Sequence, residues 1–370
     1  TMVSLLIGFM LYPVVSYDSG YYMSIMRDMH LGNIYFKDIA SPYNPLGIGL
    51  LSLPFYFTNL PDFRWSLLIN VFFIMTSSML LYNIFTWLKI HKLLRLFLSL
   101  FFITLCFTHD GNHIMLEPIS VFFQLSGLFI YLKQRPLYNP IKLLLVGICI
   151  GLSFLTKQYA LFILLPIGVD ILLSRKSFLK KTICLSIGVL IPIIILYLYY
   201  YLQDMSSLTY IKCILGKGID LDIGTGTGVN NNFKFSHFID FLFVNAFIVL
   251  IPFLLKNKAS NKQDVIFYVL LAFSSFLVFF FASFNHYFIY VFPYFLILFA
   301  YAASFTKELL KNPVFIALSL IALLKISLLT GSTFKHQFKD YKEQTHNQKV
   351  IENHIQKNSR VYLNGVSPAY

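Results

Sequence analysis

The sequence predicts an all-α polytopic membrane protein, and three observations support this fold class. Hydrophobic residues make up 57% of the 370 residues, and charged residues only 12%. Apolar runs of membrane-spanning length recur from one end of the chain to the other. The 40 Phe and 24 Tyr are typical of a helical bundle that packs rings against lipid and collects them at both interfaces. No part of the sequence indicates a separate soluble core.

About eleven membrane-spanning helices are expected, because a crossing helix needs roughly 20 apolar residues and shorter paired helices occur where the chain turns back. The expected spans are 1–17, 65–88, 94–108, 117–132, 141–156, 158–173, 183–202, 238–255, 265–284, 287–304 and 313–330. Residues 1–330 would form one transmembrane domain, with a first outer loop over 18–64 that carries juxtamembrane helices and a long outer loop over 203–237.

Residues 331–370 are expected to begin an extracytoplasmic C-terminal segment. Ile351 and Ile355 stand at helical spacing among polar residues, which predicts a short amphipathic helix there. The chain starts with Thr and stops at VYLNGVSPAY, where an extended segment begins, so both ends are expected to be incomplete.

Positive charge predicts the orientation in the membrane. Fifteen Lys and Arg lie in the loops after the second, fourth, sixth, eighth and tenth expected helices, against seven in the alternate loops. The first set is therefore expected in the cytoplasm, which places residue 18 outside. The net charge of +13 is therefore interpreted as a consequence of membrane topology and not as a sign of nucleic-acid binding. The four cysteines show neither paired nor metal-ligand spacing, so no disulfide framework is expected.

Acidic residues have the opposite distribution. Those on or near the expected outer face are Asp18, Asp28, Asp38, Asp62, Asp110, Glu117, Asp204, Asp220, Asp222 and Asp240. Acids hardly influence insertion, so topology does not explain this excess. Solvated loops account for the acids at 204–222, whereas Asp18 and Glu117 adjoin apolar runs, where an unpaired carboxylate costs on the order of a few kcal/mol. The pattern predicts an acid-lined cavity at the outer membrane boundary.

The long outer loop contains GIDLDIGTGTGVNNNF, whose Gly, Thr and Asn residues disfavour both helix and packed strand. A phosphate-cradling loop would end in Lys-Ser/Thr before a helix, and neither feature is present. This segment is therefore expected to be a mobile surface loop, with a lid over a lipid-facing site as the alternative.

Four segments carry a family resemblance. They are SYDSGYYMSIMRDMHLGNIYFKDIASPYNPLG at 16–47, LEPISVFFQLSGLFIYL at 116–132, GICIGLSFLTKQYALFILLP at 147–166 and NHYFIYVFPYFLIL at 285–298. These segments resemble four features of GT-C superfamily glycosyltransferases. The first resembles the family's first outer loop, and the second its helix that starts with an acid and a proline. The third resembles its Gly-Leu-x-x-x-Thr-Lys helix pair, and the fourth its His-Tyr-x-x-x-x-x-Pro segment. The branch is that of the protein O-mannosyltransferases and aminoarabinose transferases, glycosyltransferase family 39. The first loop departs from the pattern, with Asp18 followed by Ser19 and with Asn44-Pro45 in place of Pro-Pro.

The resemblance implies a GT-C fold and a mannosyltransferase-like membrane enzyme that transfers a sugar, with inversion, from a polyprenyl-phosphate donor to an extracytoplasmic lipid, glycan or protein acceptor. A bacterial cytoplasmic membrane, with its lipids around the bundle, is the expected location, and no nucleic acid partner is expected. The resemblance also implies that Asp18 is the general base. The alternative is a helix-end acid paired with Arg27 or Lys37.

The residues expected to bind the donor or its phosphate are Lys157, His286, Tyr287, Asp38 and Arg64. Lys157 interrupts two short apolar runs, and its alternative is a side chain that snorkels to the interface. Tyr287 alone would also fit an interfacial aromatic belt. The alternative for Asp38 is a solvated residue that pairs with Lys37. The alternative for Arg64 is a simple membrane anchor.

Glu117 precedes Pro118 at an expected helix start, where the helix dipole favours an acid without any catalytic demand. His113 stands four residues before it, so the two are expected to share a helix face. With Asp110 they also offer ligands for a divalent metal ion that would bridge the donor phosphate. No other cofactor is expected.

Two further classes of protein stay open. A transporter or flippase should show charges or broken helices near mid-membrane and an internal duplication, whereas the acids here gather at one surface. A polysaccharide ligase or polymerase also uses lipid-linked sugars. It would depend on an outer loop rich in Arg and His, where this chain has Gly, Thr and Asn.

Overall fold

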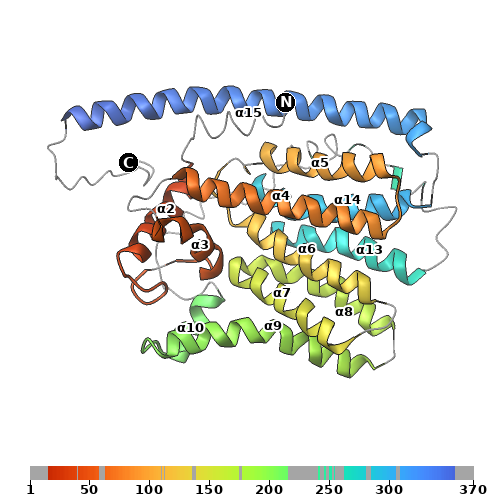
Figure 1. The fold of residues 1–370 in the computed structure, drawn as a ribbon, viewed down its shortest axis with the longest axis horizontal. Coiled ribbons are helices and arrows are strands. Elements are labelled where there is room, and N and C mark those ends of the chain that lie inside the picture. Colours follow the sequence, from red (N-terminus) through yellow and green to blue (C-terminus); the bar gives the residue numbers. More distant parts are fainter. Residues whose placement is uncertain are drawn as a thin grey trace.

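The computed structural model is a bundle of helices (Figure 1). It describes residues 16–354 except 40, 58–62, 110, 112, 136–138, 175–176, 216–240, 242–245, 247–249, 252–253, 255–261, 281–284 and 306–308. Within this described part the only β-structure is an isolated bridge between Tyr35 and Ile39. The predicted all-α fold class is confirmed.

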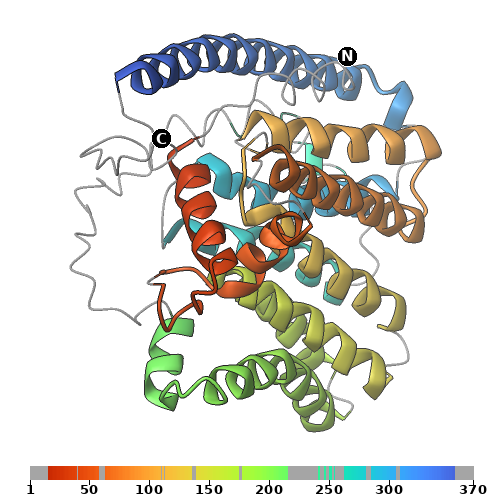
Figure 2. The same ribbon diagram turned by 60° about the vertical axis from the view of Figure 1, so that its left-hand side comes forward.

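The bundle contains nine of the described helices. They are α4 (Phe63–Trp87), α5 (Lys92–Thr108), α6 (Glu117–Gln134), α7 (Pro140–Thr156), α8 (Leu164–Leu173), α9 (Phe178–Tyr201), α13 (Lys262–Ser274), α14 (Phe288–Ala303) and α15 (Pro313–His354). Three further helices, α2 (Tyr17–His30), α3 (Pro45–Ser52) and α10 (Ser207–Ile214), lie together at one end of it (Figures 1 and 2). We call this the capped end.

Four described helices are long and apolar enough to cross a membrane: Phe63–Trp87, Phe178–Tyr201, Lys262–Phe279 and Pro313–Asn347. The apolar helices Pro45–Tyr56, Pro140–Thr156, Gln158–Leu173 and Phe288–Ala303 are shorter. The observed helices follow the expected spans except at 1–17 and 238–255, which lie wholly or mostly outside the described residues. The number of eleven spans therefore stays a prediction.

Three local features differ from expectation. Residues 158–173 do not form one α-helix, because the chain first makes the 3-10 helix η2 (Gln158–Ile163) and only then enters α8. The last expected span and the amphipathic segment form a single helix, α15, since no proline interrupts it after its first residue and Gly331 costs only about 1 kcal/mol. The long outer loop contains α10, whose Ser206 side chain accepts a hydrogen bond from Thr209 N. Its Gly- and Thr-rich part lies outside the described residues.

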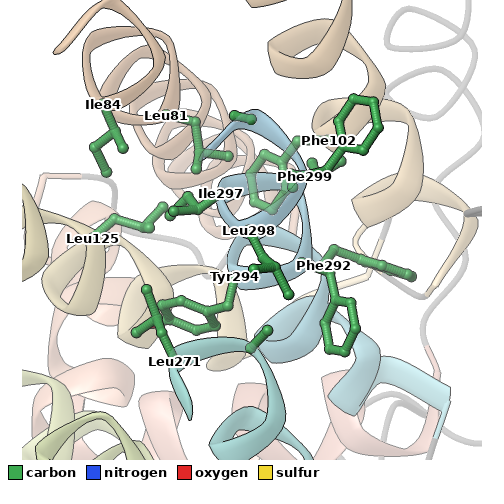
Figure 3. Packing of buried hydrophobic residues seen from close by; sticks show 14 of the residues in the cluster. Leu81, Ile84, Phe102, Leu125, Leu271, Phe292, Tyr294, Ile297, Leu298 and Phe299 are labelled. Carbon is green, nitrogen blue, oxygen red and sulfur yellow. The ribbon is translucent and has the colours of Figure 1, made fainter. Parts of the chain in front are cut away.

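Helix α14 forms the centre of the bundle, and every one of its residues is buried. A helix that is apolar on all sides has no face for water or lipid headgroups, so it packs inside the protein. Figure 3 shows Phe292, Ile297 and Phe299 of α14 among side chains from α4, α5, α6 and α13. The start of α14 is thereby held at the capped end.

Two glycines allow α7 and α9 to approach each other closely. A Cβ atom at Gly147 would overlap the carbonyl oxygen of Leu185, and one at Gly188 would overlap that of Leu144. Because only hydrogen fits at these positions, the backbones of the two helices are in direct contact. This contact fixes the axis of α7 and so the position of the residue that follows it, Lys157.

The end opposite the cap is held by a charge network. Arg135, after α6, donates to both carboxylate oxygens of Asp170 in α8, at 2.9 and 2.6 Å, and lies 2.5 Å from Asp264 in α13. Tyr131 and Gln263 donate further hydrogen bonds to Asp170, at 2.5 and 2.9 Å. Both oxygens of this buried acid are thus paired, which is the condition for a buried ion pair to be tolerated.

The Gly188 contact is testable with a single methyl group. Gly188→Ala should lower the free energy of unfolding by about 1–3 kcal/mol, because the new Cβ overlaps the α7 backbone. Gly168→Ala in α8 is the matched control, since a Cβ there meets nothing within 4 Å and should be neutral or slightly stabilising. Thermal unfolding of the detergent-solubilised variants measures the difference, and equal melting temperatures would contradict the close packing.

Candidate active site at the capped end

Lys157 is buried at the point where α7 ends and η2 begins. Its backbone is extended, with φ −155° and ψ 131°, and its N–H still bonds to the carbonyl of Ser153. The side chain is 1% exposed and forms an ion pair with Glu117. Its Nζ lies 5.3 Å from the ring centre of Tyr43 and 4.7 Å from that of Tyr287. The ammonium therefore does not snorkel to the surface.

Glu117 is the first residue of α6 and its side chain is fully buried. Pro118 follows it, and the N-cap residue Leu116 supplies no side-chain bond, so the acid stands at the positive end of the helix dipole. Oε1 contacts Lys157 and lies 3.6 Å from Nε2 of His286. Oε2 has no hydrogen-bond partner among the described residues.

His286 and Tyr287 belong to a 3-10 turn, η5 (Asn285–Tyr287), that leads directly into α14. Both residues are buried. The Tyr287 ring meets the ring of Tyr159 edge-on, with centres 5.5 Å apart. Because α14 is fixed in the core, the imidazole and the phenol are held against the Glu117–Lys157 pair.

The first outer loop docks against the end of α7. Asn44 Nδ2 donates to the carbonyl of Phe154 at 2.6 Å, and Gln158 Nε2 donates to that of Pro42 at 2.8 Å. A Cβ at Gly47 would lie 2.7 Å from Cγ2 of Thr156, so a glycine is needed for α3 to pack this closely. These contacts place the Tyr43 ring beside Lys157.

Asp18 lies in the first turn of α2 and is partly exposed. Ser16 caps this helix, with its Oγ accepting from Ser19 N at 3.2 Å. The buried Ser19 hydroxyl accepts a hydrogen bond from Ile114 N at 3.1 Å, which ties the start of α2 to the segment just before Glu117. One turn after Asp18, the Tyr22 ring packs edge-on against Tyr43, with centres 5.4 Å apart.

Electrostatics places Asp18 and Glu117 in one neighbourhood. Burial raises the pKa of the Tyr43 phenol, and the negative charges of Asp18 and Glu117 raise it further. Burial also raises the pKa of Tyr22, on which Tyr43, Glu117 and Asp18 act in the same direction. The two acids therefore act on the same pair of phenols, and Tyr22 is hydrogen-bonded to Tyr43.

Two of the predicted donor-binding residues are exposed. Asp38 is exposed, and its Oδ2 accepts a hydrogen bond from Ile34 N at 2.7 Å, so it closes its own loop. Arg64 is exposed at the start of α4. The cations considered as partners of Asp18 have other contacts: Arg27 lies 3.7 Å from Asp28, and Lys37 donates to the carbonyl of Gln203 at 2.7 Å.

The predicted helix face shared by His113 and Glu117 is wrong. The helix starts only at Glu117, because Pro118 has no N–H for a preceding helical turn and is tolerated only in the first turn; His113 lies in the non-helical segment before it. Asp110 lies outside the described residues. The described part of the chain holds no group of three or more His, Cys, Asp or Glu placed for a metal ion, and Glu117 Oε1 already binds a cation, Lys157. With Asp110 outside the described residues, the metal stays a prediction.

A polar stripe on α6 continues from Glu117 and escaped the sequence analysis. The hydroxyls of Ser120 and Ser153 lie 2.7 Å apart, joining α6 to α7. Gln124 donates to the carbonyl of Ala160 at 2.8 Å and accepts from the Tyr294 hydroxyl at 2.7 Å. Residues 117, 120 and 124 stand at i, i+3 and i+7 in an apolar helix, which is the signal that would have identified this face.

Comparison with known proteins supports the fold. The family model for dolichyl-phosphate-mannose-protein mannosyltransferase matches residues 51–215. ArnT from Cupriavidus metallidurans bound to undecaprenyl phosphate is similar in structure, with a TM-score of 0.63 and 13% identity over 100% of this chain and 82% of that one. Its apo state gives 0.55 and 14% over 92% and 74%. No curated protein sequence matches the chain.

An oligosaccharyltransferase from Archaeoglobus fulgidus in the apo form has a TM-score of 0.56 and 12% identity, over 90% of this chain and 55% of that one. At such identities the likeness concerns the fold. It agrees with the order of motifs in the sequence and with the family match over residues 51–215. The predicted resemblance is therefore confirmed: the chain is an integral membrane protein with the fold of the GT-C superfamily of glycosyltransferases.

Proposed function

We propose that the protein transfers a sugar, with inversion, from a polyprenyl-phosphate donor to an acceptor on the extracytoplasmic face. The observation that carries this proposal is the buried Lys157 ammonium, which two tyrosine rings and Glu117 surround at the same end of the bundle as Asp18. A cation taken out of water suits a phosphate group, because charge-assisted contacts are strongest where the dielectric is low. The similar ArnT structure, which has undecaprenyl phosphate bound, supports the class of donor.

The proposed reaction uses Asp18 as general base. The Asp18 carboxylate takes the proton of the acceptor hydroxyl while the hydroxyl oxygen attacks the anomeric carbon of the donor sugar. The bond between that carbon and the phosphate oxygen breaks, and polyprenyl phosphate leaves with the electron pair. Lys157 offsets the charge that develops on the phosphate, and the His286 and Tyr287 side chains line the same place.

The buried phenols complete the proposed site. The Tyr43 phenol, to which the Tyr22 side chain is hydrogen-bonded, is uncharged at neutral pH and can donate to a phosphate or sugar oxygen. Asp38 and Arg64 are assigned supporting roles only, since both are exposed. A transporter is less well supported, because the similar ArnT and oligosaccharyltransferase structures and the family match belong to glycosyltransferases.

The orientation and location are part of the same proposal. Fifteen Lys and Arg lie in the loops after the second, fourth, sixth, eighth and tenth expected helices, which the positive-inside rule assigns to the cytoplasm. The capped end would then face outward from a bacterial cytoplasmic membrane, where the acceptor is a lipid, a glycan or a protein hydroxyl. Residues 1–330 are assigned to the catalytic transmembrane domain and 331–370 to the start of an extracytoplasmic segment.

The base assignment predicts that Asp18→Asn lowers kcat by at least about 100-fold, the usual lower bound for general-base catalysis, with little change in donor binding. The measurement is sugar transfer by purified protein from a panel of radiolabelled polyprenyl-phosphate sugars. Asp28→Asn removes the same charge from an exposed position ten residues along the same helix and should keep full activity. Turnover that survives in Asp18→Asn would exclude the base role.

The phosphate assignment predicts that loss of Lys157 lowers kcat/KM for the donor by about 100-fold or more. Lys157→Met alone would leave Glu117 buried and unpaired, which costs about 3–5 kcal/mol of stability. The variant to measure is therefore Lys157→Met combined with Glu117→Gln, which removes both charges and should remain folded. An unchanged kcat/KM in this folded double variant would show that the phosphate binds elsewhere.

A further inference from the structure

The cation proposed for the donor phosphate already has an anion. Lys157 is 1% exposed, its Nζ contacts Glu117 Oε1, and the rings of Tyr43 and Tyr287 cover two further sides. The ammonium has three hydrogens, and Glu117 with the two rings covers three of its sides, so a phosphate oxygen must approach from the side that the carboxylate holds. Donor binding therefore requires that the carboxylate gives up its contact.

Glu117 is less firmly bound than a structural acid of the same protein. Its Oε2 has no hydrogen-bond partner among the described residues, although the side chain is fully buried. Asp170, the other buried acid described here, has both oxygens hydrogen-bonded by Arg135, Tyr131 and Gln263. Leaving one oxygen of a buried carboxylate unbonded is costly, so the Glu117 arrangement is one that a rearrangement can improve.

A destination for the displaced carboxylate lies beside it. His286 Nε2 is 3.6 Å from Oε1, which is too long for a hydrogen bond and short enough for one to form after a small rotation of the side chain. The imidazole is held by its neighbour Tyr287 and by α14, so it can receive the carboxylate without moving.

We propose that Glu117 is an internal substitute for the donor phosphate and determines which lipids the site accepts. Its carboxylate occupies Lys157 until a phosphate displaces it toward His286. A neutral prenyl lipid cannot make this exchange, because it would leave the buried ammonium without an anion. After transfer, the return of Glu117 to Lys157 favours release of the polyprenyl phosphate. This inference rests on the proposed function and adds the selection of an anionic carrier.

The test is binding of farnesyl phosphate, with farnesol as the neutral analogue, to the purified full chain in detergent by titration calorimetry. Glu117→Gln removes the competing charge and should bind farnesyl phosphate about tenfold more tightly, which corresponds to about 1.4 kcal/mol. Its binding of farnesol should exceed that of the wild type by far less. The matched control Asp28→Asn, which removes an exposed acid of the same face, should bind both lipids as the wild type does.

A second variant keeps the proposal testable if Glu117→Gln does not fold. Glu117→Asp retains the charge but withdraws it by one methylene group, so it should bind farnesyl phosphate about threefold more tightly. A role in merely holding Lys157 in place predicts the opposite sign, because phosphate binding would weaken when the holder is removed or shortened.

The outcomes separate the two proposals. If the wild type binds farnesyl phosphate and the Glu117 variants bind it equally well or more weakly, the proposed role of Glu117 is overturned. The proposed function is then unaffected. A wild-type protein that neither binds farnesyl phosphate nor transfers sugar from any polyprenyl-phosphate donor overturns the proposed function, and the role of Glu117 with it.

Discussion

The ion pair between Lys157 and Glu117 is the interaction on which the account of this protein depends. Two opposite charges that are almost completely buried are tolerated only because they contact each other. Their meeting requires the end of α7, the start of α6 and the start of α14 to converge, with the first outer loop laid over them. The proposed phosphate site uses the same arrangement, because an ammonium that is held where water is excluded interacts strongly with an anion that reaches it.

The remainder of the fold can be understood as the support for this convergence. Helix α14, buried along its whole length, holds His286, and the glycine contact between α7 and α9 fixes the axis that ends at Lys157. The network around Asp170 fastens α6, α8 and α13 at the far end. Because those ionic groups are fully satisfied, they behave as a structural clamp, whereas Glu117, with one oxygen unbonded, does not.

The sequence predicts the fold class and most helices because hydrophobicity with breaks at charged loops is a local signal. It also singles out Glu117 and Lys157, each a charge beside an apolar run. It does not reveal that they touch, since 40 residues separate them and only packing brings them together. Tyr43 has no distinguishing signal among many interfacial aromatics. His113 was placed on a helix because spacing alone does not show where a helix begins.

The most direct test is an experimental structure of the protein with a polyprenyl phosphate bound. The account predicts a phosphate oxygen about 3 Å from Lys157 Nζ, with the Glu117 carboxylate moved off the ammonium onto His286 and with Asp18 facing the phosphate-bearing end of the lipid. A phosphate bound away from Lys157, with the ion pair to Glu117 intact, would contradict the central claim.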